Sequence, residues 1–211
     1  MTARAWCVAA LALGACATPA PPAAPVASAP AAPVPAPTPS AAVPSVPSGT
    51  PVAIVNAGFD SDRPGVDDNP EGWATSQHAG DKSYEFVTDA QVRRSGARSF
   101  RIRNTGSEPY GAVHQAVTAA GMRGRSVRLS AWLRTDAANG EGAMLTLSAL
   151  GGGAIAAHKF MDDAPVTGTR DWRQYAITLA VPANTDVVDI GAMLVGKGTL
   201  WLDDVTLVVL P

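Results

Sequence analysis

The sequence predicts an all-β protein: a jelly-roll β-sandwich that follows an N-terminal signal and a disordered tether. Two observations predict the sandwich. After residue 51, apolar and polar residues alternate with a period of two in several short runs, as expected for strands with one buried face. Clusters rich in glycine, proline and asparagine separate these runs, as turns between strands do. A third observation, the composition of the first 50 residues, sets that region apart from the globular domain at 51–211.

The first 50 residues are predicted to be a targeting signal followed by a linker, which we call the tether. Residues 1–15 carry one positive charge followed by an apolar run that is too short to cross a bilayer, as in a secretory signal. The run ends in Leu-Gly-Ala-Cys, which resembles the lipobox of bacterial lipoproteins. That resemblance implies cleavage before Cys16, lipidation of Cys16, and, because Ala17 follows, an outer-membrane location in the cell envelope. A plain secretory signal is the alternative.

Residues 16–50 hold 11 prolines and no charged residue, which favours an extended linker.

Five runs show the alternation most clearly, and each is predicted to be a half-buried strand. They are Phe100–Arg103, Val127–Arg134, Met144–Ala149, Gln174–Val181 and Val188–Leu194. Three tryptophans near the ends of such runs, Trp73, Trp172 and Trp201, are predicted to fill the core.

The charge and cysteine content exclude two classes of function. The chain has 16 Lys and Arg against 18 Asp and Glu, a net charge of -2, so a basic surface for nucleic acid is not expected. Both cysteines, Cys7 and Cys16, precede the domain. The domain at 51–211 therefore has neither a disulfide framework nor a zinc-thiolate site.

Six short motifs occur in one order along the domain. They are Asn56–Asp60, Pro70–Trp73, Ser95–Phe100, Arg128–Arg134, Gly168–Trp172 and Gly198–Val205. In this order they resemble the carbohydrate-binding modules of the cellulose- and xylan-binding type, within the galactose-binding-like jelly-roll superfamily. The resemblance covers nearly all of 52–211. It implies the fold, but it does not identify the ligand, because one fold serves many functions.

The same resemblance implies a structural calcium ion. Its ligands would be Gly58 and Asp60 in the opening turn, the carbonyl group near Arg98, and Asp203 in the last strand. Asp203 alternates with Trp201 and Val205, which we expect to face inward, and a buried carboxylate needs a partner. The alternative is that Asp203 accepts hydrogen bonds from backbone N–H groups or an arginine.

A sugar-binding face is the second predicted site, because sugar rings pack on aromatic rings and their hydroxyls need fixed polar partners. Trp132 lies on the polar side of its strand, where an aromatic side chain calls for an explanation. We expect one open face made by Trp132, Tyr110, Arg101, Arg103, His114, Gln115, Arg128 and Arg134. The alternative is that Trp132 packs under a loop and that the arginines are solvated.

No catalytic constellation is visible in the sequence. The acidic pairs Asp67-Asp68 and Asp162-Asp163 are expected in loops, where they would face water. The sequence therefore predicts a lipid-anchored, non-catalytic envelope protein whose domain binds a glycan. The alternative is a module that binds a partner protein of the envelope and no sugar.

Overall fold

The computed structural model describes residues 49–211; the predictions for the signal, Cys16 and most of the tether lie outside the described residues. This part is built from strands, as predicted, with one short 3-10 helix and no α-helix. The strands are β1 (Thr50–Val52), β2 (Ala74–Gln77), β3 (Tyr84–Asp89), β4 (Ser99–Asn104), β5 (Tyr110–Thr118), β6 (Ser126–Gly151), β7 (Ala154–Phe160), β8 (Val166–Ala180), β9 (Val187–Val195) and β10 (Thr199–Val209); the 3-10 helix η1 is Val66–Asp68. Within the described residues no helix is long and apolar enough to cross a membrane.

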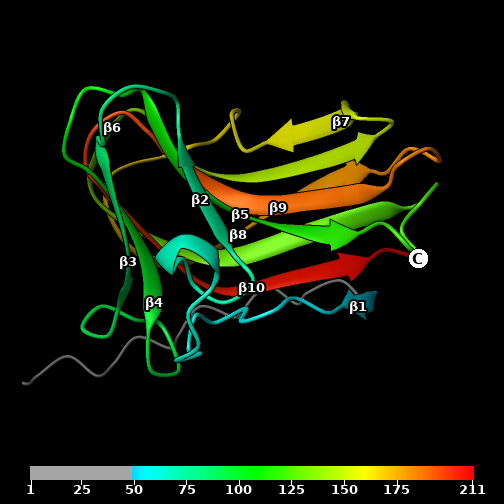
Figure 1. Ribbon diagram of the computed structural model, residues 1–211, viewed down its shortest axis with the longest axis horizontal. Coiled ribbons are helices and arrows are strands. Elements are labelled where there is room, and N and C mark those ends of the chain that lie inside the picture. The colour runs from blue at the N-terminus through cyan, green and yellow to red at the C-terminus, as the bar shows by residue number, and fades with distance from the viewer. Residues whose placement is uncertain (1–48) are drawn as a thin grey trace, which may run out of the picture. The chain divides into compact units, whose positions relative to one another are not determined.

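The long strand β6 joins the two layers of the sandwich. Its first part pairs with β8 and β10, and its last part pairs with β7 and β9. Between them Ala137, Gly140 and Gly142 have positive φ, which lets the chain turn from one layer into the other. We call the layer of β8, β6, β10, β4 and β3 the β10 layer, and the layer of β7, β6, β9, β5 and β2 the β9 layer. Figure 1 shows β5, β9 and β10 running along the domain.

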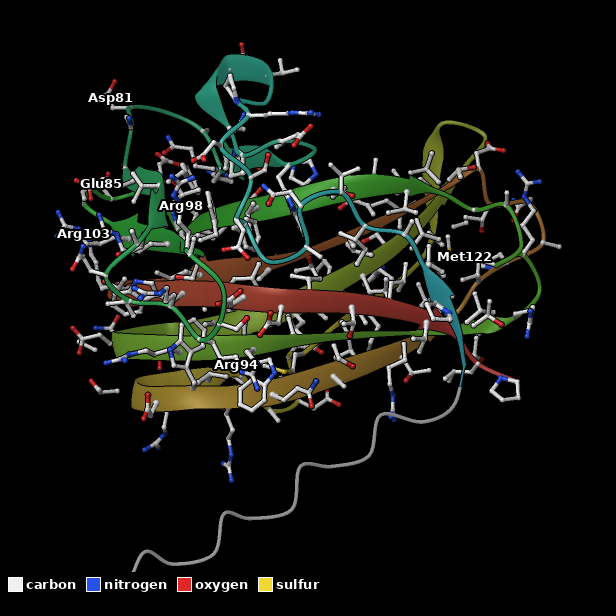
Figure 2. The ribbon with its side chains drawn as sticks, turned by 90° about the horizontal axis from the view of Figure 1, so that it is seen from below. Asp81, Glu85, Arg94, Arg98, Arg103 and Met122 are labelled. Carbon is white, nitrogen blue, oxygen red and sulfur yellow. The ribbon has the colours of Figure 1, made fainter. Side chains whose placement is uncertain are left out.

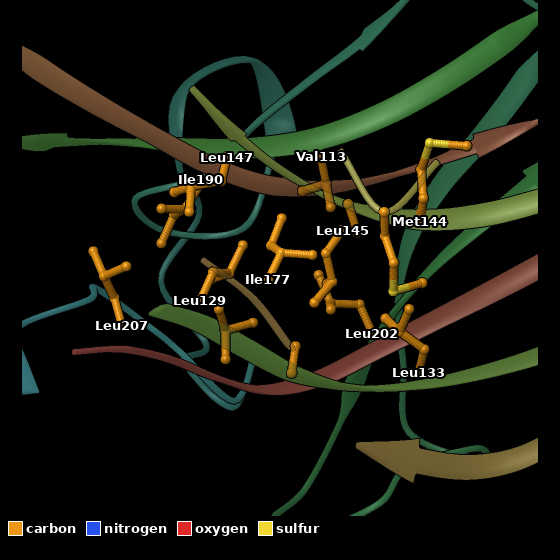
Figure 3. Close-up of a cluster of buried hydrophobic side chains, with 14 of the residues drawn as sticks. Val113, Leu129, Leu133, Met144, Leu145, Leu147, Ile177, Ile190, Leu202 and Leu207 are labelled. Atoms are coloured by element: carbon orange, nitrogen blue, oxygen red, sulfur yellow. The ribbon is translucent and has the colours of Figure 1, made fainter. Parts of the chain in front are cut away.

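The core lies between the two layers and follows the predicted alternation. Leu129 and Leu133 from the first part of β6 meet Leu145 and Leu147 from its last part, and none of the four is exposed to solvent. Figure 3 shows this cluster with side chains from β5, β8, β9 and β10. Burial of large aliphatic side chains contributes about 1.5–3 kcal/mol each, so these alternating positions hold the two layers together.

An aromatic stack closes one end of the core. The ring of Phe59 lies 4.9 Å from that of Trp73 and 5.3 Å from that of Phe100, measured between centroids. Nε1 of Trp73 donates to the carbonyl oxygen of Asn56 at 3.1 Å. Trp73 therefore fills the core, as predicted.

The two other tryptophans do not fill the core. Trp172 is only half-buried. Trp201 pairs with Arg101 of β4 and Arg134 of β6, so it lies on the outer face of the β10 layer and not on the inner one. Its Nε1 donates to Asp89 at 2.9 Å. The inward residues of this part of β10 are the neighbours Leu200 and Leu202, so the predicted phase is wrong by one residue at Trp201 and Asp203. Val205 is buried in the core, as predicted.

Candidate functional site

The eight predicted sugar-binding residues do not share one face. Arg101, Arg103, Arg128, Trp132 and Arg134 lie on β4 and the first part of β6, on the outer face of the β10 layer. Tyr110 and His114 lie on β5, on the outer face of the β9 layer. These two faces look away from each other across the core. The expectation of a single open face therefore does not hold.

Three of the predicted arginines on the β10 layer, Arg101, Arg103 and Arg134, are paired with carboxylates. Arg101 lies 3.5 Å from Glu85 and 3.6 Å from Asp89, and Arg103 lies 3.1 Å from Glu85. Figure 2 shows Glu85 and Arg103 together at one end of the domain. On β6, Arg134 lies 3.6 Å from Asp171.

Among the side chains that the structure describes, Arg128 takes no part in these ion pairs. It is half-buried and stands beside Thr178 of β8 and Val208 of β10, which are its partners across the sheet.

Trp132 is covered by Arg94, which is not among the predicted site residues. Cζ of Arg94, on the loop between β3 and β4, lies 4.2 Å from the centre of the Trp132 ring. Arg94 also pairs with Asp204 at 3.0 Å. A cation held over an indole face by a second charge leaves that face less open to a sugar ring. The geometry favours the structural alternative for Trp132.

Replacing Trp132 tests that role. We expect Trp132→Ala to lower the unfolding free energy by about 1–2 kcal/mol, because it removes the cation–π contact with Arg94 and uncovers the sheet beneath. Urea unfolding measures this loss, and glycan affinity should stay unchanged. Full stability together with lost glycan affinity would instead return Trp132 to the ligand-binding residues.

The β9 layer carries a cleft on its outer face. The cleft has a volume of about 620 Å³, and its lining includes Val66 and Trp73 on one side and His114 and Asp189 on the other. Nδ1 of His114 lies 3.0 Å from Oδ2 of Asp189. This hydrogen bond raises the pKa of His114, although partial burial acts in the opposite direction. The cleft thus combines an apolar wall at the exposed Val66 with a fixed pair of polar groups, as small-ligand sites commonly do.

The neighbour of His114 on β9 is a glycine, Gly191. Gly191 of β9 pairs with His114, and Thr146 of β6 pairs with Gly191 from the other side. A Cβ at Gly191 would collide with the carbonyl oxygen of Val113. Glycine is therefore the residue that lets these strands approach closely beside His114.

The other two predicted residues near this cleft have different roles. Gln115 is buried; its Oε1 accepts from the N–H of Val55 and its Nε2 donates to the carbonyl of Val55, both at 2.9 Å. Gln115 therefore fixes the segment before the opening turn. Tyr110 lies four residues before His114 on the same strand face, with its ring 5.8 Å from that of His78.

Asp189 was not among the predicted site residues. The sequence did carry a signal for it, since Asp189 is the charged residue between the buried positions Val188 and Ile190. The pattern could not predict that Asp189 pairs with His114, because His114 lies 75 positions earlier in the sequence.

The predicted calcium residues gather around Gly58. Oδ2 of Asp60, Oδ1 of Asp203 and Oδ1 of Asp204 lie 3.2, 3.8 and 3.9 Å from the position that a Cβ of Gly58 would occupy. Oδ1 of Asp60 accepts from the N–H of Arg98 at 2.9 Å. Asp204 was not predicted. Among residues 49–211 no group of three or more His, Cys, Asp or Glu side chains forms a metal cluster, so a cation here would also need backbone carbonyl ligands.

Asp203 is buried for a reason other than the predicted one. It stands on the outer face beside Trp132, and the loop between β3 and β4 covers it. The N–H groups of Arg94 and Ser95 donate to its Oδ2 at 2.9 and 3.2 Å, and that of Asp204 donates to its Oδ1 at 2.8 Å. Burial raises the pKa of Asp203 to about 6, and the charge of Asp204 adds to this rise against the effect of the N–H donors.

The pair Asp162-Asp163 lies at the surface and binds Lys159. The Nζ of Lys159 lies 3.4 Å from Asp162 and 2.6 Å from Asp163. This pair faces water, as expected.

No family model matches the chain. One curated relative, an uncharacterised HTH-type transcriptional regulator of Bacillus subtilis (strain 168), is 27% identical over 125 residues, which are 58% of this chain and 42% of the relative. The chain thus spans less than half the length of that relative.

Solved structures with the same fold include binding modules and enzymes. The CBM22-1 xylan-binding domain from Paenibacillus barcinonensis is 11% identical with a TM-score of 0.53, over 79% of this chain and 98% of that one. A CBM4 structure is 22% identical with a TM-score of 0.52, over 74% and 99%. An apo cyclase from Fischerella sp. is 14% identical with a TM-score of 0.56, over 78% and 98%. The described part of the chain therefore has the β-sandwich fold of carbohydrate-binding modules, as the six sequence motifs implied.

Proposed function

We propose that the domain is a non-catalytic module that binds a glycan in the cleft of the β9 layer. The observation that carries the proposal is the His114–Asp189 pair, which is fixed at 3.0 Å in a cleft of about 620 Å³. With its Nδ1 bonded to Asp189, His114 offers Nε2, which donates when the ring is protonated and accepts when the ring is neutral, and Asp189 offers carboxylate acceptors. Such groups suit vicinal sugar hydroxyls. Val66, which is 77% exposed, supplies an apolar wall for the ring. The fold shared with modules such as the CBM22-1 xylan-binding domain supports a glycan as the ligand.

We also propose that the chain is lipidated at Cys16 and displays the domain from the outer membrane of the cell envelope. The lipobox resemblance of residues 13–16 and the proline-rich tether support this placement. A binding module that is held at a membrane needs a spacer to reach a polymer. An extended proline-rich segment provides such a spacer.

Replacing His114 tests the glycan site. We expect His114→Ala to weaken glycan binding by about tenfold or more, because it removes a hydrogen-bonding group and releases Asp189 from its fixed position. The measurement is calorimetry on the purified protein with whichever polysaccharide or peptidoglycan binds in an initial screen.

His78→Ala is the matched control for that experiment. His78 also lies 3.0 Å from a carboxylate, that of Glu108, but does not line the cleft. Equal losses in both variants, or no loss in His114→Ala, would place the sugar elsewhere on the domain.

We propose calcium as a structural ion at Gly58, Asp60, Arg98 and Asp203. The gathering of carboxylate oxygens around Gly58 and the burial of Asp203 fit a hard cation in charge and in ligand chemistry. Such an ion would neutralise Asp203 and join the opening turn to β10. Its role would be stability rather than catalysis.

A second candidate function is protein binding at the edge strand β7. In the described structure β7 pairs with β6 alone, its first four residues are uncharged, and Ile155 is 62% exposed. Edge strands without charges offer backbone groups to another strand. Failure of every glycan in the screen, together with capture of one envelope protein, would favour this function.

A further inference from the structure

The cleft continues into a second hollow on the same face. This hollow has a volume of about 330 Å³ and shares two lining residues with the cleft, Ala116 and Asp189. Ala116 pairs directly with Asp189 across β5 and β9. The two hollows therefore form one groove, with the His114–Asp189 pair near its middle.

The far end of this groove is apolar. Leu150 of β6 pairs with Val187 of β9 on one side and with Ile155 of β7 on the other, so the three side chains form a row on the outer face. Leu150 and Val187 line the hollow, and Ile155 beside them is 62% exposed. We call Leu150, Val187 and Ile155 the apolar row. Exposed apolar groups gathered next to a binding cleft commonly mark a place that a ligand covers.

The carboxylate at this end of the groove, that of Asp186, already has partners within the protein. The carboxylate of Asp186 accepts from the N–H of Gly152 at 3.2 Å and lies 3.5 Å from Arg123. Gly152 and Gly153, in the turn that borders the hollow, have positive φ and no atom within 4 Å of where a Cβ would lie. As glycines, both residues add no side chain to this border of the hollow.

We propose that the groove takes a glycan that carries an alkyl or acyl chain. The sugar binds at His114 and Asp189, and the chain lies over the apolar row. This inference rests on the proposed glycan-binding function and names the class of ligand. Its physical basis is the change along one continuous groove from a fixed polar pair to three apolar side chains on neighbouring strands.

A series of alkyl glucosides tests the inference. Methyl, hexyl and octyl β-glucoside share one sugar and differ in chain length, and calorimetry below micelle-forming concentrations gives their affinities for the full chain. We expect affinity to rise with chain length, by up to about fourfold for each methylene that the apolar row buries. Equal affinities of the methyl and octyl compounds would overturn the inference and leave the proposed glycan site intact.

Two variants show where the alkyl chain of the ligand binds. Ile155→Ser is expected to remove most of the gain of octyl over methyl glucoside and to leave methyl glucoside affinity unchanged, because Ile155 does not touch the sugar end. Val87→Ser is the matched control: Val87 is a 38% exposed strand residue on the β10 layer, away from the groove. An octyl gain that survives Ile155→Ser overturns the inference.

The failure of the two proposals can be told apart. If octyl glucoside does not bind but a polysaccharide does, with His114→Ala weakening it, the inference fails and the proposed function stands. If neither glucosides nor polysaccharides bind, both fail.

Discussion

In the presence of a chelator, the unfolding free energy is expected to fall by up to about 3 kcal/mol as the pH rises from about 4 to 7, on account of Asp203 alone. The pKa of this carboxyl is about 6 in the folded protein and near 4 in an unfolded chain. The folded state therefore binds the proton more tightly. The contribution of Asp203 to stability is full below the unfolded pKa and is lost as the pH rises through the folded one.

Comparison with Asp203→Asn isolates this effect from other titrating groups. The measurement is urea unfolding of both proteins at several pH values between 4 and 7. As the pH rises from 4 to 7, the natural protein is expected to lose unfolding free energy relative to Asp203→Asn. Parallel pH profiles of the two proteins would contradict the assignment.

If the proposed ion binds, calcium should restore the unfolding free energy that the ionised Asp203 costs at neutral pH. A cation beside Asp203 favours the carboxylate, so calcium is expected to raise the melting temperature of the natural protein at pH 7 and to have little effect on Asp203→Asn. Magnesium serves as the control, because it rarely accepts a site made of several protein oxygens. No calcium response at any pH would leave Asp203 as a carboxylate held by backbone N–H groups alone.

The second large effect is expected at Phe59. Phe59→Ala should lower the unfolding free energy by about 3–5 kcal/mol, because it empties the middle of the stack with Trp73 and Phe100. Phe59 has a φ of 59°, a left-handed conformation that a bulky residue adopts only when packing holds it there. Urea unfolding measures the loss.

Two further variants keep this prediction testable. Phe59→Leu retains most of the buried volume, so it should fold and lose less stability than Phe59→Ala. Phe160→Ala, at a half-buried position on β7, should also lose less. A loss of less than about 1 kcal/mol in Phe59→Ala would mean that the stack does not hold the opening turn.

The period-two pattern predicted much of the fold because it depends on near neighbours in the chain. Phe100 and Ile102 face the core while Arg101 and Arg103 face outward, as expected. The same pattern failed on β10, where Trp201 and Asp203 face outward. There a register shift between Asp203 and Thr206 breaks the alternation, and Asp204 has a φ of 49°. No local signal in the sequence indicates where such a shift occurs.

The candidate site was only partly predictable. His114 was identified because it is a polar ring on the outward side of a strand. Its partner Asp189 and the second hollow depend on β5 pairing with β9 and β9 with β6, and these contacts join distant parts of the chain. The burial of Asp203 likewise depends on a loop more than 100 positions earlier in the sequence.

The sequence by itself therefore determined the all-β class, the core-facing side chains of β4, β6, β8 and β9, and the resemblance to a family of β-sandwiches, because period-two burial and turn residues act over a few neighbours. The tertiary structure decided which strands share a layer. That choice separated Trp132 and its arginines from His114, and brought Asp189 and the apolar row beside it. Strand pairing decides such outcomes because two outward side chains meet only when their strands belong to the same sheet face.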